Sequence, residues 1–120
     1  MTVRTVLCVD DAPPDLLHMQ KLLASASLQV LTASNGVDAL ALARSAKPDL
    51  IFLDIMMPGM DGYAVLRELK RDAQTSGIPV VFVSSKSAKA DLAWAAMQGG
   101  KGYVTKPYPP ETVFEEIKKF

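Results

Sequence analysis

Apolar and polar positions follow two alternating patterns along this 120-residue chain. Short runs rich in Val, Ile, Leu and Phe are typical of buried parallel strands. Each run is followed by a stretch with apolar residues three and four positions apart, which predicts a helix. Five such pairs occur, and the second run, the least apolar, has the character of an edge strand. The predicted strands are Arg4 to Val9, Gln29 to Ala33, Leu50 to Leu53, Val80 to Val83 and Tyr103 to Thr105.

The helical stretches carry apolar stripes and end signals. In the first, Leu16, Leu17, Leu22 and Leu23 form a stripe that we expect to face the sheet. Repeated strand and helix pairs predict an α/β fold with a doubly wound, five-stranded parallel sheet, and the length suits a single domain over residues 1–120. The predicted helices are about Pro14 to Ser25, Gly36 to Ser45, Gly62 to Asp72, Ala88 to Gln98 and Pro110 to Lys119.

Four of the apolar runs lead directly into residues suited to phosphate or metal chemistry. Asp10 and Asp11 follow the first run, and Asp54 follows the third. Ser84 and Lys106 follow the fourth and fifth runs. Ligands of open α/β sheets bind beyond the carboxyl ends of the strands. We therefore expect all five side chains to meet at one edge of the sheet.

Three carboxylates at one edge repel one another unless a cation lies between them. Mg²⁺ prefers oxygen ligands and retains several waters, so Asp11 and Asp54 are the predicted metal ligands. Asp54 stands alone after a fully apolar strand and is the predicted nucleophile, which would form an aspartyl phosphate. Lys106, fixed by the following Pro107, would contact a phosphoryl oxygen as a point charge. The alternatives are solvated loop carboxylates and an ordinary exposed lysine.

The motifs VDD, LDIMMPGMDG, VSS and TKP, in this order, resemble those of response-regulator receiver domains. The resemblance covers essentially the whole chain and is nearest to free-standing receivers of the chemotaxis and twitching-motility type. It implies the flavodoxin-like strand order 2-1-3-4-5 and a cis bond between Lys106 and Pro107. It also implies that the backbone carbonyl of Met56 is a further metal ligand, that Asp10 acts mainly through water, and that Mn²⁺ can replace Mg²⁺.

The resemblance further implies a signalling role for the predicted phosphate site. A partner histidine kinase would donate the phosphoryl group from a phosphohistidine. Ser84 would move toward the phosphate and the ring of Tyr103 would turn inward, which changes the surface of the fourth helix, fifth strand and fifth helix for a downstream protein partner. For Tyr103 an ordinary strand-edge aromatic is the alternative reading.

The same resemblance places residues that modulate hydrolysis of the phosphoryl group at Met56 and Lys86. Because an apolar Met cannot orient a water molecule, the expected autophosphatase activity is slow. The chain would then be a regulatory phosphoprotein and not an enzyme in the ordinary sense.

Composition limits the binding partners and the cellular location that we expect for this chain. Thirteen basic and thirteen acidic residues cancel, so no global field attracts nucleic acid or an anionic membrane. No apolar run is long enough to insert into a membrane, and we expect a cytoplasmic protein. The single cysteine, Cys8, reads as a core residue, and His18 as an ordinary helix residue. Trp94 is either a partner anchor or a cover for the sheet.

Three other functions fit parts of the sequence. A flavin or nucleotide binder needs glycines or hydroxyls after the first strand, whereas DDAPPD offers two negative charges and prolines without N–H groups. A hydrolytic phosphatase would carry an acid or base two residues after its nucleophile, where this chain has Met56. A receiver-like interaction module that is never phosphorylated is disfavoured because no acidic, Ser or Lys position of the family is lost. Among phosphorylated receivers, a phosphate sink for the kinase remains an alternative output.

Overall fold

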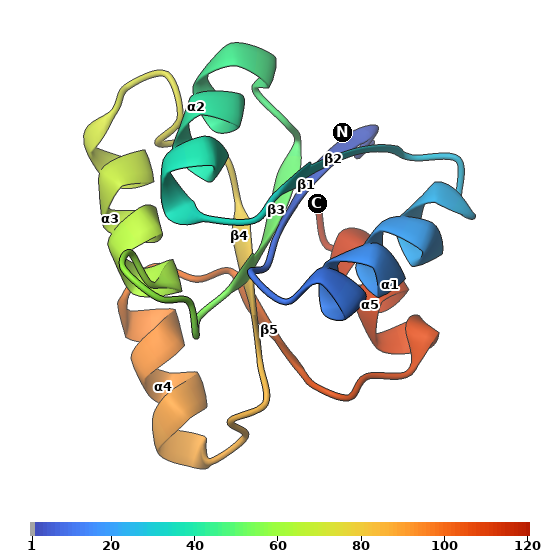
Figure 1. The fold of residues 1–120 in the computed structure, drawn as a ribbon. Coiled ribbons are helices and arrows are strands. Elements are labelled where there is room, and N and C mark those ends of the chain that lie inside the picture. The colour runs from blue at the N-terminus through green and yellow to red at the C-terminus, as the bar shows by residue number, and fades with distance from the viewer. Residues whose placement is uncertain (1) are drawn as a thin grey trace.

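Five parallel strands form one sheet in the order β2-β1-β3-β4-β5. The structure is a computed structural model that describes residues 2–120. Figure 1 shows the sheet at the centre of the molecule with helices on both sides. The predicted α/β fold and strand order are confirmed. The strands are β1 (Thr5–Val9), β2 (Gln29–Ala33), β3 (Leu50–Asp54), β4 (Val80–Ser84) and β5 (Gly102–Thr105).

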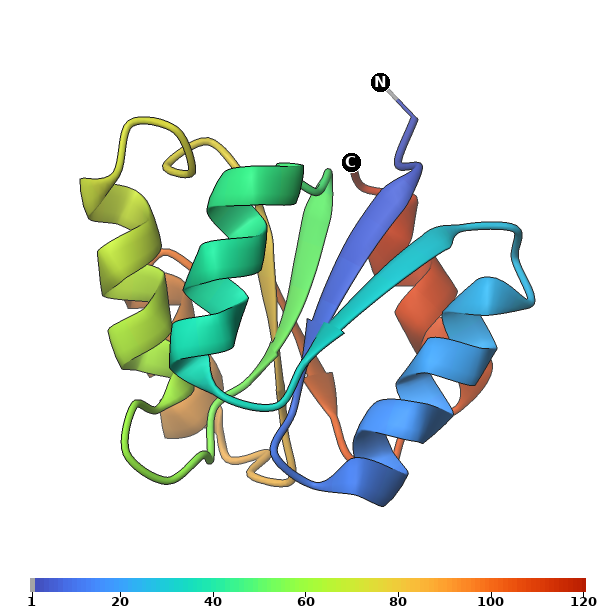
Figure 2. The same cartoon turned by 45° about the horizontal axis from the view of Figure 1, so that its top comes forward.

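The five helices form two layers that enclose the sheet. Helices α1 and α5 lie on one face, and α2, α3 and α4 lie on the other (Figures 1 and 2). All predicted boundaries fall within two residues of the observed ones. The helices are α1 (Pro13–Ala24), α2 (Gly36–Ala46), α3 (Gly62–Arg71), α4 (Lys89–Met97) and α5 (Pro110–Ile117).

The two central strands explain the continuous apolar runs. Every residue of β3 and of β4 is buried, because helices cover both faces of these strands. Strand β2 is largely half-exposed and lies at one edge, as its weaker apolar character predicts. The other edge strand, β5, has four residues and is the shortest of the five.

Helix α1 corrects one prediction about the core. Leu17 does not face the sheet, since 49% of its surface is exposed. Met19 and Leu23 are buried instead, and Leu16 packs partly against the same apolar cluster. Positions 16, 19 and 23 are three and four residues apart and share one face of a helix, while position 17 lies about 100° around the axis.

Cys8 lies in the core on the α1 and α5 side of the sheet, with 2% of its surface exposed. Burial raises the pKa of its thiol to about 12, so the thiol stays protonated at neutral pH. The prediction of a core cysteine is confirmed. In the described part of the chain, no helix has the length and apolar character needed to cross a membrane.

The first turn of α3 packs tightly against the carboxyl end of β3. The amide of Gly62 donates a hydrogen bond of 2.9 Å to the carbonyl of Ile55. A methyl group at position 62 would lie 2.5 Å from the backbone oxygen of Asp54. Only glycine permits this approach, which fixes the turn that follows Asp54.

Candidate functional site

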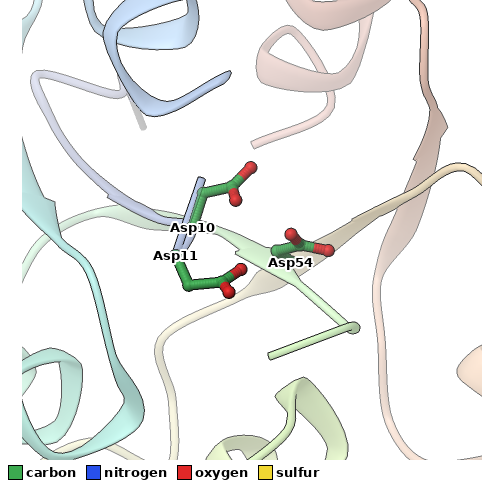
Figure 3. Close-up of side chains that lie close together, drawn as sticks. All are labelled: Asp10, Asp11 and Asp54. Atoms are coloured by element: carbon green, nitrogen blue, oxygen red, sulfur yellow. The ribbon is translucent and has the colours of Figure 1, made fainter. Parts of the chain in front are cut away.

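Three aspartates gather at the carboxyl edge of β1 and β3, as the sequence predicts (Figure 3). Asp10 and Asp11 follow β1, and Asp54 ends β3. One carboxylate oxygen from each lies within 4.8 Å of the others. Asp10 and Asp54 are buried, with 7% and 5% of their surface exposed, while Asp11 faces solvent. The site therefore has a buried floor and one open side.

Lys106 brings a positive charge to this floor from the loop after β5. Its Nζ donates to Asp10 Oδ2 at 2.7 Å and to Asp54 Oδ2 at 3.3 Å. The backbone amide of Lys106 donates to the carbonyl of Ser84 at 2.8 Å, which ties the loop to the end of β4. The peptide bond between Lys106 and Pro107 is cis, as the family resemblance implies.

Asp15 is a member of the site that sequence reasoning missed. Its Oδ2 accepts a hydrogen bond of 2.9 Å from Lys106 Nζ. Asp15 lies in the first turn of α1, where an acidic residue is ordinarily explained by the helix dipole. The available signal was its spacing, four residues beyond Asp11 at the start of a helix that begins at the site.

Backbone amides hold the two buried carboxylates in place. Asp10 Oδ1 accepts from the amide of Ala12 at 2.9 Å, and Asp54 Oδ1 accepts from the amide of Met56 at 3.1 Å. In each case the other oxygen contacts Lys106. The loops after β1 and β3 thus orient both side chains toward a common centre.

Burial and charge shift the protonation equilibria of this cluster. Burial, together with the hydrogen bond and charge of Asp10, raises the pKa of Asp54 to about 6, although Lys106 and the Met56 amide act against this shift. For Lys106, burial alone would lower the pKa. Hydrogen bonds to Asp10 and Asp15 and the charge of Asp54 outweigh burial, and the pKa lies above its ordinary value. The ammonium therefore stays charged at neutral pH.

The donor set fits a hard divalent cation. Four carboxylates surround the site, and the ammonium of Lys106 can balance only one negative charge. Asp10, Asp11 and Asp54 supply oxygen atoms close enough to share one ion, and oxygen is the ligand that Mg²⁺ prefers. The roles of Asp10 and of the Met56 carbonyl in holding that ion stay predictions.

Ser84 lies at the same edge but does not hydrogen-bond to the carboxylates. Its side chain is buried, and its Oγ accepts from the amide of Lys86 at 3.2 Å. The hydroxyl of Tyr103 donates to the carbonyl of Lys86 at 2.7 Å. Lys86 thus links Ser84 to a half-buried Tyr103 through its backbone, while the side chain of Lys86 is exposed.

A pocket of about 590 Å³ opens beside this network. Its lining includes Met56, Ser84, Trp94 and Tyr103. Trp94 is 51% exposed, whereas the neighbouring Ala95 packs against the sheet, so Trp94 is not a cover for the sheet.

His18 is an exposed residue of α1, as expected. Its ring lies 5.5 Å from that of Tyr108, measured between centroids, in a tilted arrangement. No hydrogen bond joins His18 to the carboxylate cluster within residues 2–120. It takes no part in the polar contacts of the site.

Comparisons with known proteins agree with the geometry. A family described as the response regulator receiver domain matches residues 6–118. The protein PilH of Pseudomonas aeruginosa is 43% identical over 112 residues, which cover 93% of each chain. PilG of the same organism is 35% identical over 94% of this chain and 84% of its own. The structure of the chemotaxis protein CheY4 of Vibrio cholerae superposes with a TM-score of 0.91 at 27% identity and covers 98% of both chains.

Proposed function

The chain belongs to the response regulator receiver domain family, and we propose that it is a phosphoacceptor whose Asp54 receives a phosphoryl group from a histidine kinase. Receiver domains of this family are regulatory parts of two-component phosphorelays and not classical enzymes. We also propose that residues 1–120 form a single receiver domain.

One observation carries the proposal. Asp54, the buried carboxylate at the end of β3, lies 3.3 Å from the ammonium of Lys106 and within reach of two further carboxylates. A nucleophile, a fixed cation and a set of metal ligands are what phosphoryl transfer to a carboxylate requires. Solvated loop carboxylates would not explain the burial of Asp10 and Asp54.

In the proposed step, an oxygen of Asp54 attacks phosphorus as the P–N bond of the phosphohistidine breaks. The bonding electron pair returns to the imidazole nitrogen, which then takes a proton. Lys106 donates to a phosphoryl oxygen and offsets its charge. The amide of Met56, which already donates to Asp54 Oδ1, keeps the carboxylate oriented during the attack.

Receiver domains bind Mg²⁺ in this acidic site, and the bound ion neutralises phosphoryl oxygens. We propose that Asp11 and Asp54 hold it directly, with the Met56 carbonyl as a third ligand and Asp10 acting mainly through water. Mn²⁺, which accepts the same oxygen ligands, would substitute.

We propose that the output is a protein contact on the surface of α4, β5 and α5. Helix α4 carries three exposed large apolar residues, Leu92, Trp94 and Met97. Tyr103 of β5 lines the same pocket as Ser84 and Trp94, which supports a switching role for Ser84 and Tyr103. No direct nucleic-acid contact is proposed, because the thirteen acidic and thirteen basic residues balance.

The setting we propose is chemotaxis or twitching-motility signalling in the cytoplasm. Similarity to PilH, to PilG and to a chemotaxis protein structure over nearly the whole chain supports this setting. Service as a phosphate sink for the kinase would use the same chemistry with no downstream partner.

Intact-mass spectrometry after incubation with acetyl phosphate tests the proposal. With Mg²⁺ we expect a gain of one phosphoryl group that is absent in Asp54→Asn and reduced when EDTA is added. The cognate histidine kinase should give the same singly phosphorylated protein. No gain from either donor would contradict phosphoacceptor function and leave a receiver-like interaction module.

A further inference from the structure

The ammonium of Lys106 is fully engaged in this structure. It contacts Asp10 at 2.7 Å, Asp15 at 2.9 Å and Asp54 at 3.3 Å. A lysine ammonium has three N–H donors, so three acceptors use all of them. A phosphoryl oxygen can bind Lys106 only if one of these contacts is weakened or given up.

Asp15 differs from the other two acceptors. Asp10 and Asp54 belong to the cluster that can hold a metal ion, whereas Asp15 lies outside it. The Asp15 side chain is 49% exposed, while that of Lys106 is 19% exposed. Its contact can therefore persist when the oxygens of Asp10 and Asp54 turn to a metal ion.

The start of α1 holds Asp15 in position. Pro13 and Pro14 form the first turn of the helix, and each proline ring fixes its own φ angle. The amide of Ala12 donates to Asp10 Oδ1 at 2.9 Å, which ties this turn to the floor of the site. The pairing with Lys106 thus comes from a stiff segment and not from a free loop.

We propose that Asp15 is a positioning residue that holds the ammonium of Lys106. By doing so it favours metal binding and slows phosphoryl transfer. This inference rests on the proposed function. By drawing the ammonium outward, Asp15 frees Asp10 and Asp54 for a divalent cation. By competing for the ammonium and adding a negative charge, it slows transfer of the phosphoryl group.

The two effects have the same physical origin and modest size. An ion pair with one half-exposed partner changes an equilibrium or rate constant by at most about fivefold. Removing the charge of Asp15 should therefore weaken Mg²⁺ binding and speed phosphorylation, each by about two- to fivefold. Loss of a residue with a merely structural role would not weaken Mg²⁺ binding and at the same time speed phosphorylation.

The experiment compares wild type, Asp15→Asn and Asp15→Glu. Glu111→Gln is the matched control, because Glu111 is also an exposed acid in the first turn of a helix that follows a strand. Calorimetric titration gives the Mg²⁺ dissociation constant, and intact mass gives the rate of phosphorylation by acetyl phosphate at saturating Mg²⁺. The ¹H–¹⁵N NMR signal of the Lys106 ammonium reports its contact with Asp15 directly. The signal is assigned by its loss in Lys106→Arg.

We expect Asp15→Asn to raise the Mg²⁺ dissociation constant, to raise the rate and to shift the Lys106 signal, with Asp15→Glu close to wild type and Glu111→Gln unchanged. Unchanged constants in Asp15→Asn, or a slower rate with a normal fold, would overturn the inference. If wild type accepts no phosphoryl group, the proposed function fails. The calorimetric and NMR results then still decide whether Asp15 positions Lys106.

Discussion

At the scale of single residues, burying the charged carboxylate of Asp54 has an energetic cost. Burial and the neighbouring Asp10 raise its pKa to about 6, above the value of 3.8 of an unperturbed carboxyl. The folded protein therefore binds this proton more tightly than the unfolded chain does. Its contribution to stability is complete below pH 4 and is lost as the pH rises through about 6.

Asp54→Asn should therefore stabilise the metal-free protein at pH 7.5. The neutral amide removes a buried negative charge, while Lys106 keeps Asp10 and Asp15 as partners. The gain in free energy of unfolding should be on the order of 1–2 kcal/mol and should shrink toward pH 4. Urea unfolding in EDTA at several pH values measures it, and a less stable variant at pH 7.5 would contradict this account.

Met56 gives a prediction about the lifetime of the phosphorylated state. Its side chain is 54% exposed beside Asp54, and a thioether is a poor partner for water. Met56→Asn should speed loss of the phosphoryl group several-fold, because an amide can orient the attacking water. Intact mass followed over time measures the decay. Met97→Asn, at an exposed methionine of α4, is the control, and equal decay in all three proteins would remove the idea.

At the scale of elements, the sequence predicted what depends on local pattern. Strands β3 and β4 are buried throughout, so their apolar runs marked both the strands and the positions of Asp54 and Ser84 at their ends. The edge position of β2 followed from its weaker apolar character. The prediction for Leu17 was wrong because two adjacent leucines do not show which of them lies on the buried face of the helix. Packing against the sheet decides this.

Contacts between loops that are far apart along the chain could not be predicted from the sequence. Asp15 and Lys106 are 91 residues apart, and no periodicity links the first turn of α1 to the loop after β5. The hydrogen bond from Tyr103 to the carbonyl of Lys86 joins a strand to a backbone group, which no side-chain pattern reveals. Such pairings follow from the three-dimensional course of the loops.

The tight packing of α3 against β3 predicts a sensitive glycine. In Gly62→Ala the new methyl group would lie 2.5 Å from the Asp54 carbonyl oxygen and 2.8 Å from the Ile55 Cα. Backbone atoms cannot move aside as a flexible side chain does, so we expect a loss of about 1–3 kcal/mol in stability and slower phosphorylation of Asp54. Urea unfolding and acetyl phosphate labelling measure the two effects.

Gly77→Ala provides the matched control for this helix packing. No atom lies within 4 Å of the methyl group that it would add. Its stability and labelling should remain near those of wild type. Equal behaviour of the two alanine variants would show that the helix and strand tolerate separation at this point.

At the scale of the whole molecule, one edge of the sheet connects two different surfaces. The carboxylates and Lys106 gather where β1, β3 and β5 end, while Leu92 and Trp94 of α4 line pockets together with Tyr103 of β5. Between them, the amide of Lys86 donates to Ser84 and its carbonyl accepts from Tyr103. A change at Ser84 can therefore reach Tyr103 through one residue of backbone.

This short path predicts how Tyr103 variants respond to phosphorylation. Trp94 and Tyr103 line the same pocket, so the emission of Trp94 reports changes there. Tyr103→Ala should accept a phosphoryl group at Asp54 but lose most of the Trp94 response and, with it, the preference of a partner for the phosphorylated state. Tyr103→Phe, which keeps the ring and loses only the hydroxyl bond to Lys86, separates packing from hydrogen bonding. If Tyr103→Ala keeps the full response and the same partner preference as wild type, the signal does not pass through Tyr103.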